Sequence, residues 1–232
     1  MHEMTLAHRI LQYHRALKPD WDLPEGFDLL YPYDDPDTWT AMESFYRKYY
    51  TSGADRIFLF GINPGRFGAG ITGVPFTDPV RLEGICGIKN PFAKRLELSS
   101  EFVYTVVEAM GGPEAFFNDF YVSAICPLGF TTAGKQGNPV NANYYDDRRL
   151  ESAVKPHIIR HLQDQEQLGM RHRRVVCLGE GQNFKFFQKL NAATALLEEI
   201  VPLPHPRWVM QYRRKKMQEY VDRYRVVLEG LL

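Results

Sequence analysis

The sequence has few cysteines and no long apolar run. Its three cysteines stand far apart among 232 residues and form no CxxC pair. This spacing excludes a zinc ribbon and an iron–sulfur cluster, and scattered cysteines fit a reducing cytosol, so we expect a cytoplasmic protein. No run approaches the roughly 18 apolar residues of a membrane span, and the N-terminus lacks the apolar segment of a signal peptide.

The sequence also lacks an excess of either charge. There are 28 Lys and Arg residues against 28 Asp and Glu residues, which gives a formal net charge of zero. A protein that is basic over its whole surface is therefore excluded, although a local basic face is not. With 44% hydrophobic and 24% charged residues the chain has globular composition, which rules out disorder along its whole length.

Short apolar runs alternate with helical patterns along the chain. Runs too short for helices predict strands at 57–62, 120–125, 175–179 and 200–203, and helices are expected at 100–111, 146–167, 182–192 and 212–228. This alternation predicts an α/β three-layer sandwich with a central, mostly parallel four-stranded sheet flanked by helices. We expect a single domain over 1–232, with residues 1–50 as a helical N-terminal extension that contains a loop at 18–37.

A glycine-rich segment at 61–76 follows the first predicted strand, with five glycines and two prolines. Residues 68–73 match the GxGxxG pattern, but the glycines come several residues after the strand, and Pro75 and Pro79 oppose a following helix. A P-loop is also rejected because Ile71 occupies its lysine position. Asn63, at the exit of the strand, has two equally weighted interpretations: it orients a water in a ligand crevice, or it caps a turn before Pro64.

A second unusual segment follows the last predicted strand, at 203–216. It combines His205, an aromatic and aliphatic tip and a basic cluster; residues 205–232 hold seven Lys and Arg against three Asp and Glu. The cluster suits phosphate contacts, aided by the N-terminus of the helix at 212–228. The tip residues Trp208, Val209 and Met210 are candidates to wedge into a base stack. The alternative is that Trp208 and Met210 are core residues and the charged run is a solvated face.

These two segments together resemble the uracil-DNA glycosylase superfamily, most closely its single-strand-selective (SMUG-like) branch. Residues 61–68 and 72–76 are similar to the first motif of that branch almost position by position, and His205-Pro206 to the start of its second motif. The segments at 121–128 and 175–181 match in the expected order. The resemblance covers roughly residues 56–228.

The resemblance implies hydrolysis of the N-glycosidic bond of a base flipped out of DNA, without a metal or a diffusible cofactor. It implies that Asn63 positions the attacking water and that neutral His205 stabilises the departing base. It further implies three groups of contact residues. The base-binding residues are Ile62, Gly65, Phe76, Ser123 and Ala124. The DNA-binding residues are Arg66, Arg207, Trp208, Val209, Met210, Arg213, Arg214 and Lys215. DNA is the expected partner, and we expect a monomer, associated with the nucleoid if the source is bacterial.

The sequence departs from the branch at the base-recognising asparagine, which is replaced by Ala124. Ser123 points to the opposite face of a strand and cannot substitute for it, so backbone groups, Asn141 or Asn143 are alternative contacts. Gly65 lies where other branches place a bulky residue that excludes substituted pyrimidines. We therefore expect a relaxed pocket that accepts uracil, xanthine and 5-substituted uracils.

The sequence is also compatible with two other functions: a nucleic-acid-binding module that has lost catalysis, and a hydrolase of free nucleosides or nucleotides.

Three smaller features of the sequence are expected to be structural. His157 and His161 are four residues apart and are expected on an exposed helix face, because no third metal ligand accompanies them. Asp78 is expected to cap a turn or helix, and the acidic residues at 20–37 to form a solvated loop.

Overall fold

The computed structural model describes residues 4–232 and has a parallel four-stranded sheet at its centre. The strand order is β3 (Phe120–Ala124), β2 (Arg56–Gly61), β6 (Met170–Leu178) and β7 (Glu199–Leu203). All three strand pairs are parallel, with Gly61 opposite Ala124 and Leu178 opposite Leu203. Every residue of β2 and β3 is buried, as expected for strands covered on both faces. The predicted fold class is confirmed.

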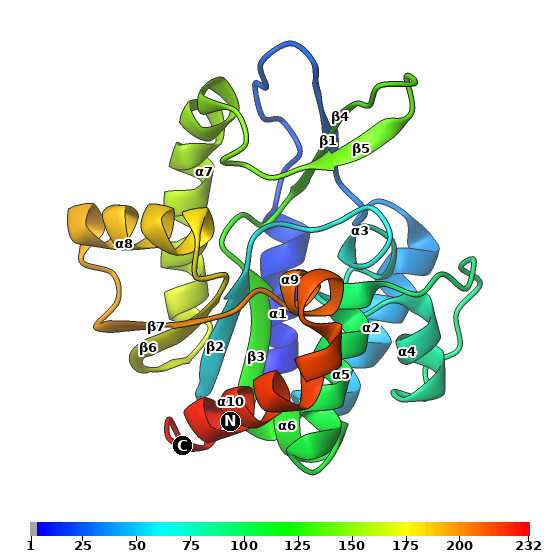
Figure 1. Ribbon diagram of the computed structural model, residues 1–232, viewed down its shortest axis with the longest axis vertical. Helices are drawn as coiled ribbons and strands as arrows, with labels where there is room; N and C mark the ends of the chain where they lie inside the picture. Colours follow the sequence, from blue (N-terminus) through cyan, green and yellow to red (C-terminus); the bar gives the residue numbers. More distant parts are fainter. Residues whose placement is uncertain (1–3) are drawn as a thin grey trace.

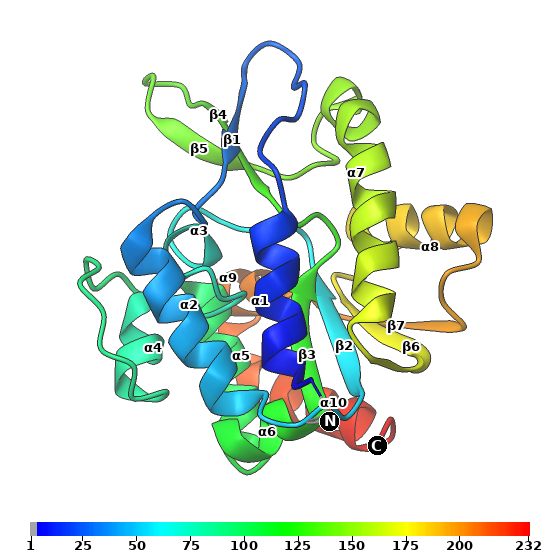
Figure 2. The same ribbon diagram turned by 180° about the vertical axis from the view of Figure 1, so that it is seen from behind.

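Helices cover both faces of this sheet. Helices α1 (Leu6–Ala16), α2 (Pro36–Tyr49) and α7 (Arg148–Gln167) lie in front of it in Figure 2. Helices α5 (Leu98–Ala109), α9 (Pro206–Tyr212) and α10 (Met217–Glu229) lie in front of it in Figure 1. Helix α6 (Pro113–Asp119) precedes β3, and α8 (Gln182–Thr194) connects β6 to β7 and contacts β6. Among the described residues, no helix combines the length and the apolar character of a membrane span.

The helix predicted at 212–228 begins later, as α10, and a separate helix, α9, precedes it. Helix α9 ends at Tyr212, a short 3-10 turn follows at Arg214–Lys216, and α10 begins at Met217. The helix whose N-terminus points to the end of β7 is therefore α9, which begins directly after His205.

A second, antiparallel sheet was not predicted. It contains β1 (Phe27–Leu30), β4 (Gly129–Ala133) and β5 (Pro139–Ala142), and it projects at the top of Figure 1. β1 lies within the segment 18–37 that was expected to be a loop only. Strands of four or five residues carry too little periodicity to be recognised, and the pairing of β1 with β4 joins segments that are distant in sequence.

The glycine-rich segment after β2 also contains short helices. Residues Ala69–Thr72 form α3 and Pro79–Gly84 form α4. The expectation that Pro79 opposes a helix is wrong, because Pro79 occupies the first helical position, where proline is favoured. The Asp78 carboxylate accepts hydrogen bonds from Val80 N and Arg81 N, which confirms its predicted role as a cap.

Candidate active site

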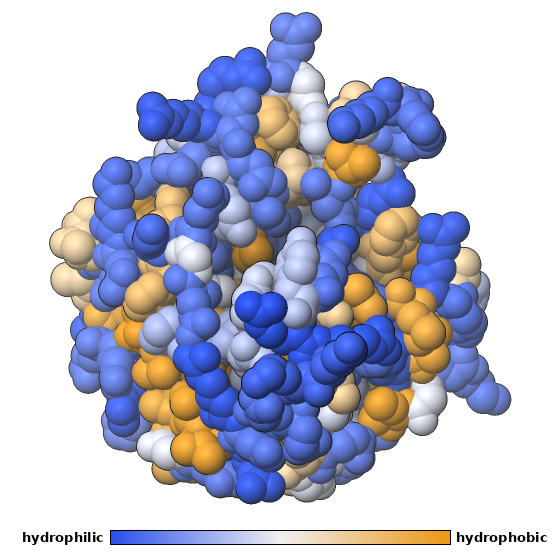
Figure 3. Space-filling view, viewed as in Figure 1, coloured by the Kyte–Doolittle hydropathy of each residue, from blue (hydrophilic) through white to orange (hydrophobic). Residues whose placement is uncertain are grey.

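A pocket of about 580 Å³ lies at the carboxyl ends of the four parallel strands. Asn63, Phe76 and His205 all line it, although they come from two loops far apart in sequence. The other predicted residues that line it are Ile62, Gly65, Ser123, Ala124, Asn141, Asn143, Arg207 and Trp208. Hydrophilic side chains surround the hollow near the centre of the face in Figure 3. The pocket also includes Glu97 and Tyr145, which carried no sequence motif.

The Asn63 amide is held mainly by the end of β5 and the residues that follow it. Its Nδ2 donates to the carbonyl oxygen of Ala142 at 3.2 Å and of Pro64 at 3.3 Å, and its Oδ1 accepts from Tyr144 N at 3.2 Å. An amide oxygen has two acceptor sites, so Oδ1 retains one for a water molecule. These hydrogen bonds join the loop after β2 to the end of β5, which neither sequence hypothesis predicted, and the side chain also lines the pocket.

Phe76 stands in the pocket with a backbone conformation that is unusual for a bulky residue. Its φ is 52°, which costs of order 1–3 kcal/mol and is found where the surroundings enforce it. Its ring lies over Gly61, where a Cβ atom would come within 2.7 Å of Phe76 Cε2. The ring centroid is 6.0 Å from that of His205. The glycine at the end of β2 is therefore required for the aromatic ring to form a pocket wall.

His205 is a neutral hydrogen-bond donor aimed at the pocket. Its Nδ1 accepts the backbone N–H of Arg207 at 3.1 Å, which caps α9. Burial, with a smaller contribution from the Arg207 charge, lowers the pKa of His205 to about 4. A neutral imidazole that accepts at Nδ1 carries its proton on Nε2. His205 therefore presents an N–H group to the pocket at neutral pH.

The floor of the pocket carries no base-recognising amide at position 124. Ser123 and Ala124 both line the pocket, and the Ala124 carbonyl is bound from below by His161 Nε2 at 2.8 Å. His161 was expected on an exposed helix face, but only 3% of it is exposed. That expectation is wrong because His161 continues the buried stripe of α7 formed by Leu150, Val154 and Ile158.

Part of the predicted DNA-binding tip belongs to the core. Val209 is 0% and Met210 3% exposed, so the expectation that they contact DNA is corrected: they anchor α9 on the molecule. Trp208 is 39% exposed, and the Arg213 guanidinium lies 5.0 Å from its ring centroid. Val209 and Met210 are therefore core residues, and Trp208 is the one tip residue on the surface.

The remaining predicted cations lie outside the pocket lining. Arg214 pairs with Glu101 at 2.9 Å, and Lys215 is exposed in the 3-10 turn. Arg66 bonds to the Pro139 carbonyl and stacks on the Phe67 ring at 4.4 Å. Tyr212, which is 64% exposed at the rim, was missed by the sequence analysis although it adjoins the basic cluster.

Comparisons with known proteins agree with this geometry. The family model of the Uracil DNA glycosylase superfamily matches residues 48–229. The crystal structure of wild-type SMUG2 from Pedobacter heparinus is similar with a TM-score of 0.95 and 41% sequence identity, and the match covers 99% of both chains. These two findings confirm the resemblance to the SMUG-like branch. The chain belongs to the uracil DNA glycosylase superfamily.

Proposed function

We propose that Asn63 and His205 carry out N-glycosidic bond hydrolysis on a deaminated base that is flipped out of DNA. The chain is a uracil-DNA glycosylase of the hydrolase type. We extend its substrates to xanthine and 5-substituted uracils, because Ala124 provides no side-chain amide and Gly65 no bulk. The observation that carries the proposal is the convergence of Asn63, Phe76 and His205 in one pocket.

The geometry supports different roles for Asn63, in the loop after β2, and His205, which follows β7. The Asn63 Oδ1 accepts a hydrogen bond from the attacking water and so directs the water oxygen to the sugar C1′. As the C1′–N bond breaks, its electron pair moves to the base, and the Nε2–H of His205 donates to the oxygen on which the charge develops. Water supplies the hydroxyl on C1′, and its other proton passes through solvent to the departing base anion, which leaves an abasic site and the neutral free base. Phe76 stacks on the base and holds it in place.

The surface beside the pocket supports contact with the DNA backbone. Arg207, Trp208 and Tyr212 form the pocket rim on α9, and Arg213 stacks on Trp208. Arg66 follows β2, and Arg214, which pairs with Glu101, and Lys215 follow α9. We propose that these cations contact phosphates and that Trp208 contacts the strand from which the base is removed.

The test is alkaline cleavage of labelled oligonucleotides that carry uracil, xanthine, hypoxanthine or 5-hydroxymethyluracil. The wild type is expected to release uracil, and Asn63→Ala to lower the rate at least roughly 100-fold, because the water loses its orientation. Asn138→Ala, in the turn between β4 and β5, is the matched control and should cleave like the wild type.

Three outcomes would contradict parts of the proposal. Uracil release with complete refusal of xanthine would contradict the relaxed pocket. Turnover of free deoxyuridine without DNA would indicate a small-molecule hydrolase instead. Salt-dependent DNA binding without base release would indicate a binding module that has lost catalysis.

A further inference from the structure

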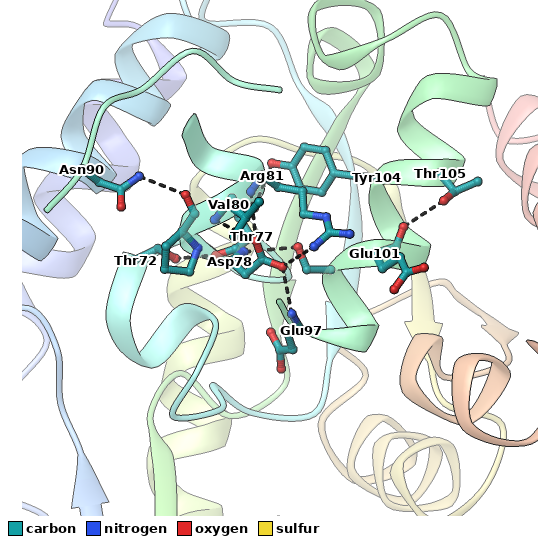
Figure 4. A network of polar contacts seen from close by, with 12 residues as sticks. Thr72, Thr77, Asp78, Val80, Arg81, Asn90, Glu97, Glu101, Tyr104 and Thr105 are labelled. Carbon is teal, nitrogen blue, oxygen red and sulfur yellow. Dashed lines mark hydrogen bonds and ion pairs between the residues drawn. The ribbon is translucent and has the colours of Figure 1, made fainter. Parts of the chain in front are cut away.

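A carboxyl group that the proposed mechanism does not use, that of Glu97, lines the same pocket. Its backbone N–H donates to Asp78 Oδ2 at 2.9 Å, at the start of α5. Asp78 is completely buried and is itself fixed by Arg81 at 2.8 Å. Figure 4 shows the Glu97 main chain joined to this network while its carboxyl points away from it. The network therefore fixes the Glu97 main chain at the edge of the pocket.

The Glu97 carboxyl has no hydrogen bond or ion pair with any residue of the described chain, 4–232. A Cβ atom on Gly68 would overlap with its Oε2, so the carboxyl fits here only because residue 68 has no side chain. Burial and the nearby Asp78 charge raise the pKa of Glu97 to about 7, while Arg207 opposes this shift. An unpaired carboxyl group that lines a pocket is a candidate for contact with a ligand.

A hydrogen-bond donor faces the same space. Asn141 Oδ1 accepts the backbone N–H of Arg66 at 3.1 Å, which turns Asn141 Nδ2 toward Gly65. A Cβ atom on Gly65 would lie 3.2 Å from Asn141 Nδ2 and 3.6 Å from Glu97 Oε1. The missing side chain of Gly65 thus leaves room for a group that meets an amide donor and a carboxylate acceptor together.

Deamination creates the matching pattern on a base. Uracil and hypoxanthine present a ring N–H beside a carbonyl oxygen, whereas cytosine and adenine present a ring nitrogen acceptor beside an amino group. We propose that Glu97 and Asn141 recognise this N–H and carbonyl edge, with Glu97 accepting from the ring N–H and Asn141 Nδ2 donating to the oxygen. The pair replaces the amide that position 124 lacks. This inference rests on the proposed function, because it requires a deaminated base in the pocket.

The first test uses alanine substitutions and oligonucleotides that carry either uracil or xanthine, whose ring N–H also lies beside a carbonyl oxygen. Glu97→Ala and Asn141→Ala are each expected to lower kcat/KM for both bases roughly ten- to hundred-fold, since a buried polar group loses its partner. Glu108→Ala, on the exposed side of α5, and Asn138→Ala are matched controls that should keep wild-type values. A loss confined to one of the two bases would overturn the shared-edge recognition.

The second test separates recognition from a structural role. Glu97→Gln keeps an acceptor oxygen, so it should restore most of the activity lost in Glu97→Ala and should not vary between about pH 6 and pH 8. The wild-type kcat/KM should rise over this range as Glu97 ionises. The charged groups that face Glu97 are Asp78, already paired with Arg81, and Arg207, while His205 stays neutral with a pKa of about 4.

The two proposals fail in different ways. If the wild type releases no base, the proposed function fails. If the wild type releases uracil but Glu97→Ala, Asn141→Ala and the pH profile of Glu97→Gln all match it, the recognition by Glu97 and Asn141 is refuted while the glycosylase remains.

Discussion

Two histidines of this protein have similar pKa values and the same protonated nitrogen, but they lie in different surroundings. Burial lowers the pKa of both His205 and His161 to about 4. Each accepts a hydrogen bond at Nδ1, His205 from Arg207 N and His161 from the Tyr13 hydroxyl, and so each carries its proton on Nε2. The two histidines differ at Nε2. In His161 this nitrogen donates to the Ala124 carbonyl, whereas His205 lines the pocket and its Nε2 has no partner among the described residues.

This comparison shows that neither burial nor a shifted pKa identifies a functional histidine. His161 satisfies both of its ring nitrogens within the chain, so its contribution is to hold β3 against α7 and α1. His205 accepts a hydrogen bond at Nδ1, which fixes its ring, and its Nε2 is the donor that we propose for the substrate. A fixed ring with one unused donor is the arrangement that catalysis by hydrogen bonding requires.

The largest expected effect is the loss of rate in His205→Asn. The Asn side chain can still cap α9 by accepting from Arg207 N, but it is too short to present a donor at the position of Nε2. We expect base release to slow roughly 100- to 1000-fold, as for other lost donors to a developing negative charge, with a melting temperature close to that of the wild type. Single-turnover cleavage of a uracil oligonucleotide measures the rate. An unchanged rate would show that His205 has no catalytic role.

The second effect is on stability and is expected for His161→Leu. The substitution leaves the Ala124 carbonyl and the Tyr13 hydroxyl without their partner, and unpaired buried groups cost about 1–3 kcal/mol each. We expect the free energy of unfolding to fall by roughly 2–4 kcal/mol in urea titrations, and the cleavage rate per folded molecule to change less than about three-fold. Tyr13→Phe in the same background should recover part of the loss.

The pH dependence of unfolding sharpens this result. His161 stays neutral in the folded state down to about pH 4 but takes up a proton near 6.5 when unfolded. The unfolded state therefore binds more protons between these values, so the folded state loses stability as the pH falls from 6.5 to 4. His161→Leu should lose less stability than the wild type over this interval. His14, whose pKa is lowered to about 3 by burial and by His161, continues to contribute in both proteins. Equal acid sensitivity of the two proteins would contradict the assignment.

The same pair of histidines shows what the sequence could predict. His205 was identified because it follows a strand and begins a motif, and parallel strands deliver such residues to one edge of the sheet. The central sheet was predictable for a related reason, since continuous apolar runs report strands buried on both faces. Local sequence is thus sufficient to predict where the pocket lies and which two side chains we propose to react there.

The residues that the sequence analysis missed depend on distant contacts. His161 carried a usable signal, because its helical spacing from Ile158 and Val154 places it on the buried stripe. Glu97 carried none, because its place in the pocket follows from the Asp78 network and the space left by Gly68. The antiparallel sheet that orients Asn63 through Ala142 depends on pairing between separate segments. Such features follow from the tertiary structure rather than from periodicity.

The smallest expected effect concerns the surface beyond His205. Trp208 lies three residues further along α9, exposes 39% of its surface and stacks with Arg213, while the adjoining Val209 and Met210 are buried. Because Trp208 contributes an aromatic face and no reacting group, Trp208→Ala should weaken binding of uracil oligonucleotides by roughly five-fold and leave the single-turnover rate at saturation unchanged. Fluorescence anisotropy at low salt measures the affinity, and Val226→Ala, an exposed apolar residue on α10, is the matched control. A fall in the saturated rate with unchanged affinity would instead place Trp208 with His205 in the chemical step, and the distinction between the pocket and its rim would then have to be abandoned.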